Sequence, residues 1–317
     1  MTASPSFPSV SAGVPVDVLI PTCGRPEALA VTLAGLANQT HPEFRVVISD
    51  QTPAPAPAAL DAPAVVAMLR QLRHRGHEVE THRRRARRGM AEQRQFLLDR
   101  AAAPAVLCLD DDIFLEAPTL GRMRQALGEL GCGFVGAAPQ GLSYLDDVRP
   151  AEHESFEPVI GAVVPERVRK GKPGWERWRL HNAANLAHLT ARLADQDAAP
   201  AARSGPGSAN GPDLGRDGAA AAEWVAYKVA WVAGCVLYDR AALVEAGGFA
   251  FWRRLPTGHR GEEIVAQLRV MERRGGVGLL PSGAVHLELP TSVVDRTVDA
   301  YAAIVEADEA PPDRSTP

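Results

Sequence analysis

The sequence has few aromatic residues and no excess of positive charge. Aromatic side chains make up 5% of the 317 residues, and 34 Lys and Arg face 38 Asp and Glu, which gives a net charge of −4. Proteins that coat nucleic acid usually carry basic surfaces with interleaved aromatic residues, so this composition disfavours that function. The hydrophobic fraction of 46% excludes a chain that is disordered throughout.

Cysteine is also scarce. The four cysteines are far apart in the sequence and lie in or beside apolar stretches: Cys23, Cys108, Cys132 and Cys235. None has the short spacing typical of zinc ligands. We therefore expect buried free thiols in a reducing compartment rather than disulfides or a zinc site.

No long hydrophobic run is free of charge. The most apolar stretch, Ala219 to Tyr238, contains Glu223 and Lys228 and does not have the pattern of a membrane span. Met1 to Val14 has neither a basic residue nor an apolar centre, unlike a signal peptide. We expect a cytoplasmic protein with no transmembrane segment and at most peripheral contact with a membrane.

Short apolar segments alternate with helix-like segments in the first half of the chain. Val16 to Ile20, Phe44 to Ser49 and Ala105 to Leu109 have the pattern of strands that are buried on both faces. The order β-α-β-α-β-α-β predicts an α/β fold with a mainly parallel central sheet and helices on both faces.

The second half has a less regular pattern. Ala230 to Tyr238 is expected to form a strand, and Asp239 can cap the helix that follows. A further helix is expected from about Gly261 to the glycine pair at Gly275. The segment from Asp195 to Ala222 is rich in Ala, Gly and Pro, which predicts a flexible insertion.

Polar residues follow three of the predicted strands. Thr22 and Arg25 follow the first strand, Asp50 ends the second, and the triplet Asp110–Asp112 follows Leu109. Ligands of open α/β sheets bind beyond the carboxyl ends of the strands. The sequence therefore predicts a binding site at this edge of the sheet. Taken alone, Asp50 is as well explained as a turn residue as by contact with a nucleotide.

The acidic triplet is a candidate metal site. Three adjacent carboxylates repel one another, so a fold that keeps them at a strand end is expected to supply a cation. In an extended segment, Asp110 and Asp112 would point to the same side and could share one ion. Carboxylate oxygens favour Mg²⁺ or Mn²⁺. A solvated acidic turn is the alternative interpretation.

Three further patterns have both a functional and a structural interpretation. The basic run Arg83–Arg88, followed by Arg94 in the next helix, would suit a diphosphate, although most of these arginines could be solvated. The pair Glu262–Glu263 could supply a general base, or it could simply favour a helix N-terminus. His286, between two apolar residues, could bind a metal or be a core histidine.

Five segments with these features follow one another in a characteristic order: Val18–Pro26, the strand that ends at Asp50, the strand that ends in Asp110–Asp112, Trp231–Cys235 with Gly247–Phe249, and Gly261–Glu263. Together they resemble family 2 glycosyltransferases. The resemblance covers about residues 16–287. It implies a GT-A type nucleotide-diphospho-sugar transferase fold and an enzyme that moves a sugar from a nucleotide diphosphate donor with inversion at the anomeric carbon.

The resemblance also implies roles for individual residues. Asp50 would contact the base of the nucleotide, and Asp110 and Asp112 match the DxD motif of the family. Glu263 occupies the position of the usual catalytic base, where the family more often has Asp. The expected nucleotide-sugar-binding residues are Pro21, Thr22, Arg25, Asp50, Arg94, Asp110 and Asp111; the expected metal ligands are Asp112, Asp110 and His286; the expected catalytic residues are Glu263 and Glu262.

The expected reaction is metal-dependent, uses Mn²⁺ or Mg²⁺, and favours a UDP-sugar donor with an unknown acceptor. A Gln-x-x-Arg-Trp element, typical of processive synthases, is absent from the sequence, so a single addition is expected. One catalytic domain is expected at residues 15–305, with a nucleotide-binding half at about 15–115 and an acceptor half at about 116–305. Residues 1–14 and 306–317 are expected to be tails.

Three other functions stay open from the sequence. A phosphatase of the haloacid dehalogenase type also has a DxD motif after a strand, but usually after the first strand and with Thr or Val where this chain has Phe114. A nucleotidyltransferase should have a glycine-rich basic signature, whereas Pro21–Pro26 contains one Gly and one Arg. A catalytically inactive sugar-nucleotide-binding protein is the third alternative.

Overall fold

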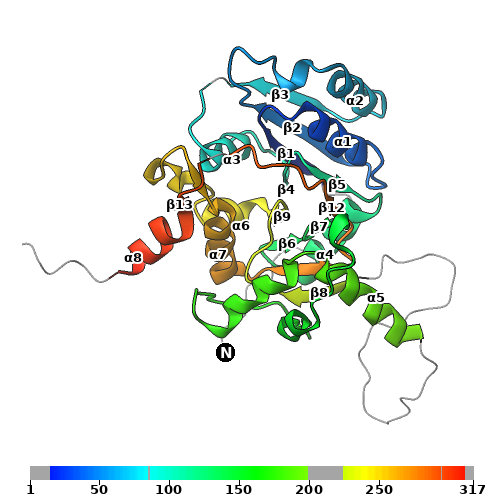
Figure 1. Ribbon diagram of the computed structural model, residues 1–317, viewed down its shortest axis with the longest axis vertical. Helices are drawn as coiled ribbons and strands as arrows, with labels where there is room; N and C mark the ends of the chain where they lie inside the picture. Colours follow the sequence, from blue (N-terminus) through cyan, green and yellow to red (C-terminus); the bar gives the residue numbers. More distant parts are fainter. Residues whose placement is uncertain (1–14, 85, 199–223, 294, 311–317) are drawn as a thin grey trace, which may run out of the picture.

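A central sheet of eight strands, in the order β3-β2-β1-β4-β9-β6-β11-β8, forms the middle of the molecule (Figure 1). The computed structural model describes residues 15–84, 86–198, 224–293 and 295–310. Most of the insertion expected at 195–222 therefore lies outside the described residues, as do the segments 1–14 and 311–317.

The elements of the described chain have the following bounds. The strands of the central sheet are β1 (Val16–Thr22), β2 (Phe44–Asp50), β3 (Val79–Arg83), β4 (Ala105–Leu109), β6 (Phe134–Gly136), β8 (Val225–Lys228), β9 (Cys235–Asp239) and β11 (Val277–Leu280). Shorter strands are β5 (Ile113–Leu115), β7 (Gln140–Gly141), β10 (His259–Arg260), β12 (Ala284–His286) and β13 (Val298–Asp299). The α-helices are α1 (Pro26–Ala37), α2 (Pro63–His74), α3 (Met90–Leu98), α4 (Thr119–Leu130), α5 (Asn185–Ala198), α6 (Arg240–Glu245), α7 (Glu262–Arg274) and α8 (Ala307–Glu309). Segments of 3₁₀-helix lie at Ala59–Asp61, Leu142–Tyr144, Pro150–Ser155, Pro173–His181 and Ala250–Arg254, and a π-helical turn lies at Tyr301–Glu306.

The sheet is mixed, with a parallel half that carries the predicted site edge. Strands β3, β2, β1 and β4 are parallel neighbours, and β6 is parallel to β11. Strand β9 runs antiparallel between β4 and β6, and β8 is an antiparallel edge strand. Because Thr22 is paired with Asp50 in register, the ends of β1 and β2 lie at the same edge. The predicted α/β fold with a mostly parallel sheet is confirmed.

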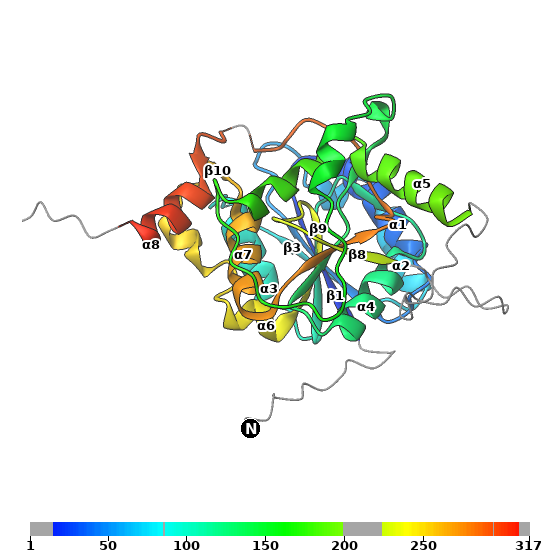
Figure 2. The ribbon, with the colours of Figure 1, turned by 90° about the horizontal axis from the view of Figure 1, so that it is seen from below.

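Two hydrophobic cores, one on each face of the sheet, follow from the alternation of side chains along the strands. In β1, Val18 and Ile20 pack with α1, α2 and α4, whereas Leu19 belongs to the core formed with α3, α6 and α7. Figure 2 shows these two groups of helices on opposite sides of the sheet. Within the described ranges, the longest apolar helices fall short of what a membrane crossing requires.

Local signals fix several helix ends. Pro26 occupies the first turn of α1, where a missing N–H costs nothing. The side chain of Asp239 accepts a hydrogen bond from the backbone N–H of Ala242 at 2.7 Å, so the predicted cap of α6 is confirmed. Gly275 ends α7 with a φ of 69°, a conformation that favours glycine.

The predicted strand over Ala230–Tyr238 is wrong in its first half, because β9 begins only at Cys235. The backbone turns at Gly234, where φ is 70°. Ala230 and Val232 before that turn are still buried, and the backbone of Val232 pairs with a side chain in place of a strand. Its N–H donates to Oε1 of Gln267 at 2.7 Å, and its carbonyl accepts from Nε2 of the same side chain at 2.6 Å.

All four cysteines are free, as predicted. Cys108, Cys132 and Cys235 are buried, whereas Cys23 is only half-buried. Burial raises the pKa of the Cys108 and Cys132 thiols to about 12, so both stay protonated at neutral pH.

Asp17 links the first strands of the sheet through one buried carboxylate. It accepts two hydrogen bonds from Arg45 on β2, both at 2.9 Å, and two from the backbone N–H groups of Ala102 and Ala103. Burial alone would raise the pKa of Asp17, but these partners together hold it below its usual value. The carboxylate therefore stabilises the fold only while it is ionised.

We expect Asp17→Asn to lower the free energy of unfolding by about 2–4 kcal/mol at pH 7, because the substitution leaves Arg45 without its buried partner. A group with a lowered folded-state pKa contributes stability above its unfolded-state pKa and loses it on acidification. Urea titrations from pH 7 to pH 3 should therefore show the two proteins converging as the pH falls. A constant difference across that range would contradict this role for the Asp17 carboxylate.

Candidate active site

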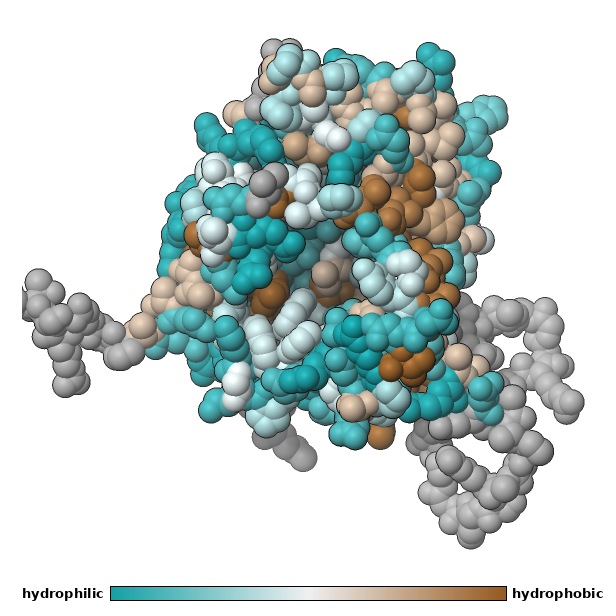
Figure 3. All heavy atoms as spheres, viewed as in Figure 1, coloured by the Kyte–Doolittle hydropathy of each residue, from teal (hydrophilic) through white to brown (hydrophobic). Residues whose placement is uncertain are grey.

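A cavity of about 450 Å³ opens at the carboxyl ends of β1 and β4. Figure 3 shows a hollow near the middle of the face seen in Figure 1, with hydrophilic residues around it. The cavity is lined by Pro21, Thr22, Cys23, Arg25, Met90, Arg94, Asp110, Asp111, Asp112, Ala233, His259, Arg260, Gly261, Glu262, Glu263, His286, Leu289, Thr291, Ser292, Val293 and Arg296. The cavity thus lies at the predicted edge of the sheet. All of the predicted site residues except Asp50 line it.

One side of this cavity is built around Arg25, at the start of α1. Its guanidinium donates to Asp112 at 2.7 Å and also to Asp111. Asp111 is fully buried and accepts a second hydrogen bond from the hydroxyl of Thr22 at 2.6 Å. Burial raises the pKa of Asp111 to about 6, although Arg25 and Thr22 act in the opposite direction.

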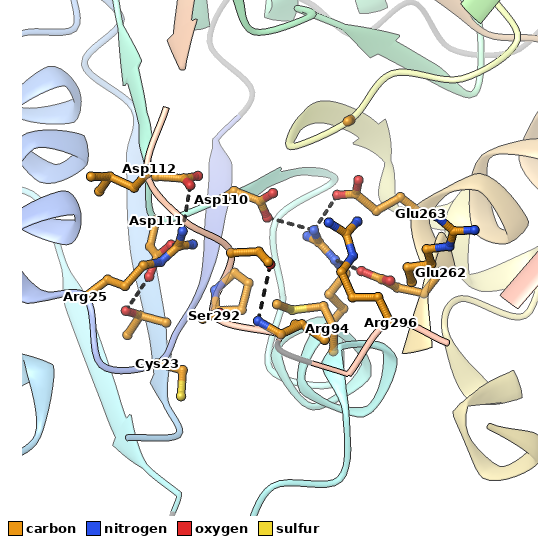
Figure 4. Close-up of a pocket in the computed structure, with 18 of the residues that line it drawn as sticks. Cys23, Arg25, Arg94, Asp110, Asp111, Asp112, Glu262, Glu263, Ser292 and Arg296 are labelled. Atoms are coloured by element: carbon orange, nitrogen blue, oxygen red, sulfur yellow. Dashed lines mark hydrogen bonds and ion pairs between the residues drawn. The ribbon is translucent and has the colours of Figure 1, made fainter. Parts of the chain in front are cut away.

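The other side is built around Arg94, which α3 carries into the edge of the sheet. Its side chain is 3% exposed and contacts three carboxylates: it donates to Asp110 at 2.7 Å, to Glu262 at 3.2 Å and to Glu263. Figure 4 shows Asp110, Glu262 and Glu263 around this guanidinium. One positive charge thus faces three acidic groups. The Nη1 atom of Arg94 is buried and has no hydrogen-bond partner among the described residues.

Burial and this imbalance both affect the protonation of Glu263. Burial raises the pKa of Glu263 to about 8; Arg94 opposes the increase, and the neighbouring Asp110 and Glu262 carboxylates add to it. The side chain is 15% exposed at the cavity wall. A carboxyl group with a pKa near neutral can exchange a proton with a bound hydroxyl.

Gly234 brings Asp110 and Glu263 together. Its carbonyl accepts a hydrogen bond from the N–H of Asp110 at 2.8 Å, and its own N–H donates to Glu263 at 3.2 Å. A Cβ at this position would lie 2.6 Å from Ile113 and 3.1 Å from the Asp110 carboxylate. Together with its positive φ, this close approach requires glycine here.

The acidic triplet does not form the extended segment considered above. Asp111 and Asp112 begin a turn, and the side chains of Asp110 and Asp112 contact different arginines. Oδ2 of Asp112 lies 3.6 Å from Nε2 of His286. Among the described residues, no group of three or more His, Cys, Asp or Glu side chains is arranged to hold a metal ion.

The hydrogen bonds of His286 bear on its predicted role as a metal ligand. The N–H of Glu288 donates to Nδ1 of His286 at 2.9 Å, so a neutral ring carries its proton on Nε2. That nitrogen faces Asp112 and has no free lone pair for a metal in this arrangement. Asp112 still has its carboxylate at the cavity, and one or two carboxylates with substrate phosphates are a common Mg²⁺ donor set.

Asp50 lies outside the large cavity. Its carboxylate accepts hydrogen bonds from the N–H and hydroxyl of Thr52, at 2.8 and 2.5 Å, and from the N–H of Leu60 at 3.2 Å. It lines a separate cavity of about 230 Å³ together with Pro55 and Arg84. These contacts give Asp50 a structural task in the loop after β2, while contact with a base stays a prediction.

The basic run before α3 is largely paired. Arg83 contacts Asp61, Arg84 contacts Glu92 at 2.6 Å, and Arg87 donates to the carbonyl of Ser292 at 3.4 Å. Arg85 lies outside the described residues.

Four residues that build the site were not among those predicted from the sequence. His259 is buried, and its Nε2 accepts a hydrogen bond from the N–H of Ala91 at 3.1 Å, which ties β10 to the start of α3. Gln93 joins the ends of β1 and β2 through the carbonyls of Thr22 and Ser49. The other two are Arg260 and Arg296, which line the cavity beside α7. The only sequence signal was the position of His259 and Arg260 just before Gly261.

A family model described as glycosyl transferase family 2 matches residues 17–196, more than half of the chain. The chain belongs to this family. This match places it among the glycosyltransferases, and its mixed sheet with helices on both faces is the fold class expected from the sequence. The expected fold class and enzyme class are confirmed, and the phosphatase and nucleotidyltransferase alternatives are set aside.

Solved structures of glycosyltransferases are similar to this one. S. aureus TarS 1–349 has 13% identity and a TM-score of 0.48, covering 83% of this chain and 57% of that chain. The mannosyltransferase PcManGT from Pyrobaculum calidifontis, in complex with GDP-Man and Mn²⁺, has 14% identity and a TM-score of 0.45, covering 84% of this chain and 56% of that chain. The glycosyltransferase thus spans little more than half of their lengths. The comparison with curated proteins found no match.

Removal of the Arg94 charge should destabilise the fold, because three carboxylates would lose their buried counter-charge. We expect Arg94→Met to lower the free energy of unfolding of the glycosyltransferase by about 3–5 kcal/mol at pH 8. Arg254→Met, which breaks an exposed ion pair with Asp308, is the matched control and should cost less than about 1 kcal/mol. Chemical denaturation of both variants checks the expectation; equal stabilities would contradict it.

Proposed function

We propose that this glycosyltransferase transfers one sugar per catalytic cycle to an acceptor hydroxyl, with inversion at the anomeric carbon and with the help of a divalent cation. The observation that carries the proposal is the placement of Glu263. Its carboxyl group faces the cavity, contacts Arg94, and has a pKa raised toward neutral by burial.

In the proposed mechanism, Glu263 is the general base. The acceptor oxygen attacks the anomeric carbon, and its proton passes to a carboxylate oxygen of Glu263. The bond between the anomeric carbon and the diphosphate oxygen breaks, and its electron pair leaves with the nucleoside diphosphate. Arg94 holds the base in position through its hydrogen bond and keeps part of the Glu263 population ionised at neutral pH.

Inversion requires the base and the leaving group on opposite sides of the sugar. Figure 4 shows Glu262 and Glu263 on one side of the cavity, and Arg25, Asp111 and Asp112 on the other. A diphosphate beside Arg25 would leave the sugar between the two groups. The buried Nε of Arg25 has no hydrogen-bond partner among the described residues and would gain one from a phosphate oxygen.

The charge of the cavity supports metal dependence. Five carboxyl groups line it: Asp110, Asp111, Asp112, Glu262 and Glu263. A diphosphate brought among them needs further positive charge. Asp112 is the residue we propose to hold Mg²⁺ or Mn²⁺, together with oxygens of the diphosphate. When bound, the ion would neutralise the charge that develops on the leaving group.

Some features of the reaction follow from the family resemblance and stay predictions. A UDP-sugar is the first donor to test, because uridine is the commonest base in the family. A single addition is proposed because the sequence has no Gln-x-x-Arg-Trp element. A cytoplasmic location is likewise a proposal.

Glu263→Gln should leave the affinity for nucleoside diphosphate nearly unchanged and lower kcat by about 10²–10⁴-fold, the usual share of general base catalysis. Glu262→Gln is the matched control, because Glu262 also contacts Arg94 but is more deeply buried, and its effect on kcat should be smaller. Both rates can be measured as donor hydrolysis. A nearly normal Glu263→Gln beside an inactive Glu262→Gln would reverse the assignment.

Asp112→Asn should remove the metal-dependent part of nucleotide binding. We expect Mn²⁺ to increase the thermal stabilisation of the wild-type enzyme by UDP, and to add nothing in the variant. Asp146→Asn, at an exposed aspartate that does not line the cavity, controls for the loss of one negative charge. If Mn²⁺ adds equally to wild type and Asp112→Asn, the proposed metal ligand is wrong.

A further inference from the structure

Two arginines at the cavity have no acidic partner. Arg260, at the end of β10, and Arg296, shortly before β13, both line the cavity, and both are exposed. Neither guanidinium forms a hydrogen bond or ion pair with any described residue, unlike Arg25 and Arg94, the other two arginines of the cavity. Two free cations at the wall of a substrate cavity require an explanation.

The other two arginines of the cavity are already neutralised. Arg25 contacts Asp111 and Asp112, and Arg94 contacts Asp110, Glu262 and Glu263, so all five cavity carboxyl groups have an arginine partner. Arg260 and Arg296 are therefore the cavity arginines that the described carboxyl groups do not engage. They are available to a ligand.

The position of these arginines favours the acceptor over the donor. Arg260 directly precedes Gly261 and the two glutamates at the start of α7. Figure 4 shows Arg296 on the side of Glu262 and Glu263, away from Arg25 and Asp112. The strand pair β10–β13, in which Arg260 is opposite Asp299, holds the two segments side by side. The segments that carry both arginines thus lie together at the end of the cavity where α7 begins, not at the side proposed for the diphosphate.

We propose that the acceptor carries an oxyanion, a phosphate or a carboxylate, and that Arg260 and Arg296 bind it while the hydroxyl beside it is presented to Glu263. This inference rests on the proposed function, because it takes Glu263 as the base. Guanidinium groups bind phosphate and carboxylate through paired, charge-assisted hydrogen bonds. A neutral acceptor would leave both charges without a partner, so the pair also selects against neutral acceptors.

The test compares a neutral sugar with two anionic derivatives of it. The full-length enzyme is saturated with UDP and Mn²⁺, and calorimetry measures the binding of glucose, glucose 6-phosphate and glucuronate. Transfer from UDP-sugars to the same three acceptors is followed in parallel. Vesicles of phosphatidylcholine, with and without phosphatidylinositol, form a separate arm that distinguishes a lipid headgroup from a soluble anion as the source of the charge.

We expect glucose 6-phosphate or glucuronate to bind the wild-type enzyme at least about 10-fold more tightly than glucose does. The double variant Arg260→Gln, Arg296→Gln should lose this advantage. Arg70→Gln, at an exposed arginine of α2 outside the cavity, is the matched control and should keep the advantage. The affinity for UDP, measured on each variant without acceptor, should change by less than about threefold.

Two results would overturn the proposal while leaving the proposed function intact. One is equal binding of charged and neutral acceptors by a wild-type enzyme that binds UDP. The other is a double variant that loses UDP affinity but keeps its preference for anions, which would assign the arginines to the donor. An enzyme that binds no nucleoside diphosphate would instead refute the proposed function, and the acceptor proposal with it.

Discussion

The arrangement of the site depends on one buried ion cluster, in which the guanidinium of Arg94 is surrounded by Asp110, Glu262 and Glu263. The four residues come from α3, the end of β4 and the start of α7, which are far apart in the sequence. A buried charge of this kind is tolerated only with groups of opposite charge beside it. The cluster therefore fixes how these three elements meet, and with them the floor of the cavity.

The same cluster sets the chemistry. Burial raises the pKa of Glu263, and the neighbouring Asp110 and Glu262 carboxylates, which share one cation with it, add to the increase. A carboxylate at its ordinary pKa would be a weak base, and one shifted toward neutral is better matched to a hydroxyl proton. The contacts that stabilise the fold thus also set the pKa of the proposed base, Glu263.

Local sequence patterns were enough to predict the sheet edge and most of its residues. Apolar runs located β1, β2 and β4, and the polar residues after β1 and β4 meet at one cavity. The strand predicted at Ala230 was too long, because the segment before Gly234 is as apolar as a strand but pairs with the side chain of Gln267. Burial, and not strand pairing, explains that pattern.

Partnerships between distant residues could not be predicted in this way. The sequence assigned Arg94 to the nucleotide sugar, whereas in the structure its guanidinium contacts three carboxylates, two of them more than 160 positions away. Asp50 has the spacing of a base-binding residue, yet its oxygens are engaged by Thr52 and Leu60. Such contacts depend on how the whole chain folds, so neither the periodicity of apolar residues nor a local motif predicts them.

The most direct test of this account is the pH dependence of kcat/KM for donor turnover in the presence of Mg²⁺, which reports the pKa of the base in the free enzyme. With a pKa of Glu263 raised to about 8, kcat/KM should increase with pH across neutrality and level off above that value. The increase should be absent from the residual activity of Glu263→Gln. A profile that is already level at pH 6, or a rising limb that persists in Glu263→Gln, would contradict the proposal that the Arg94 cluster tunes this base.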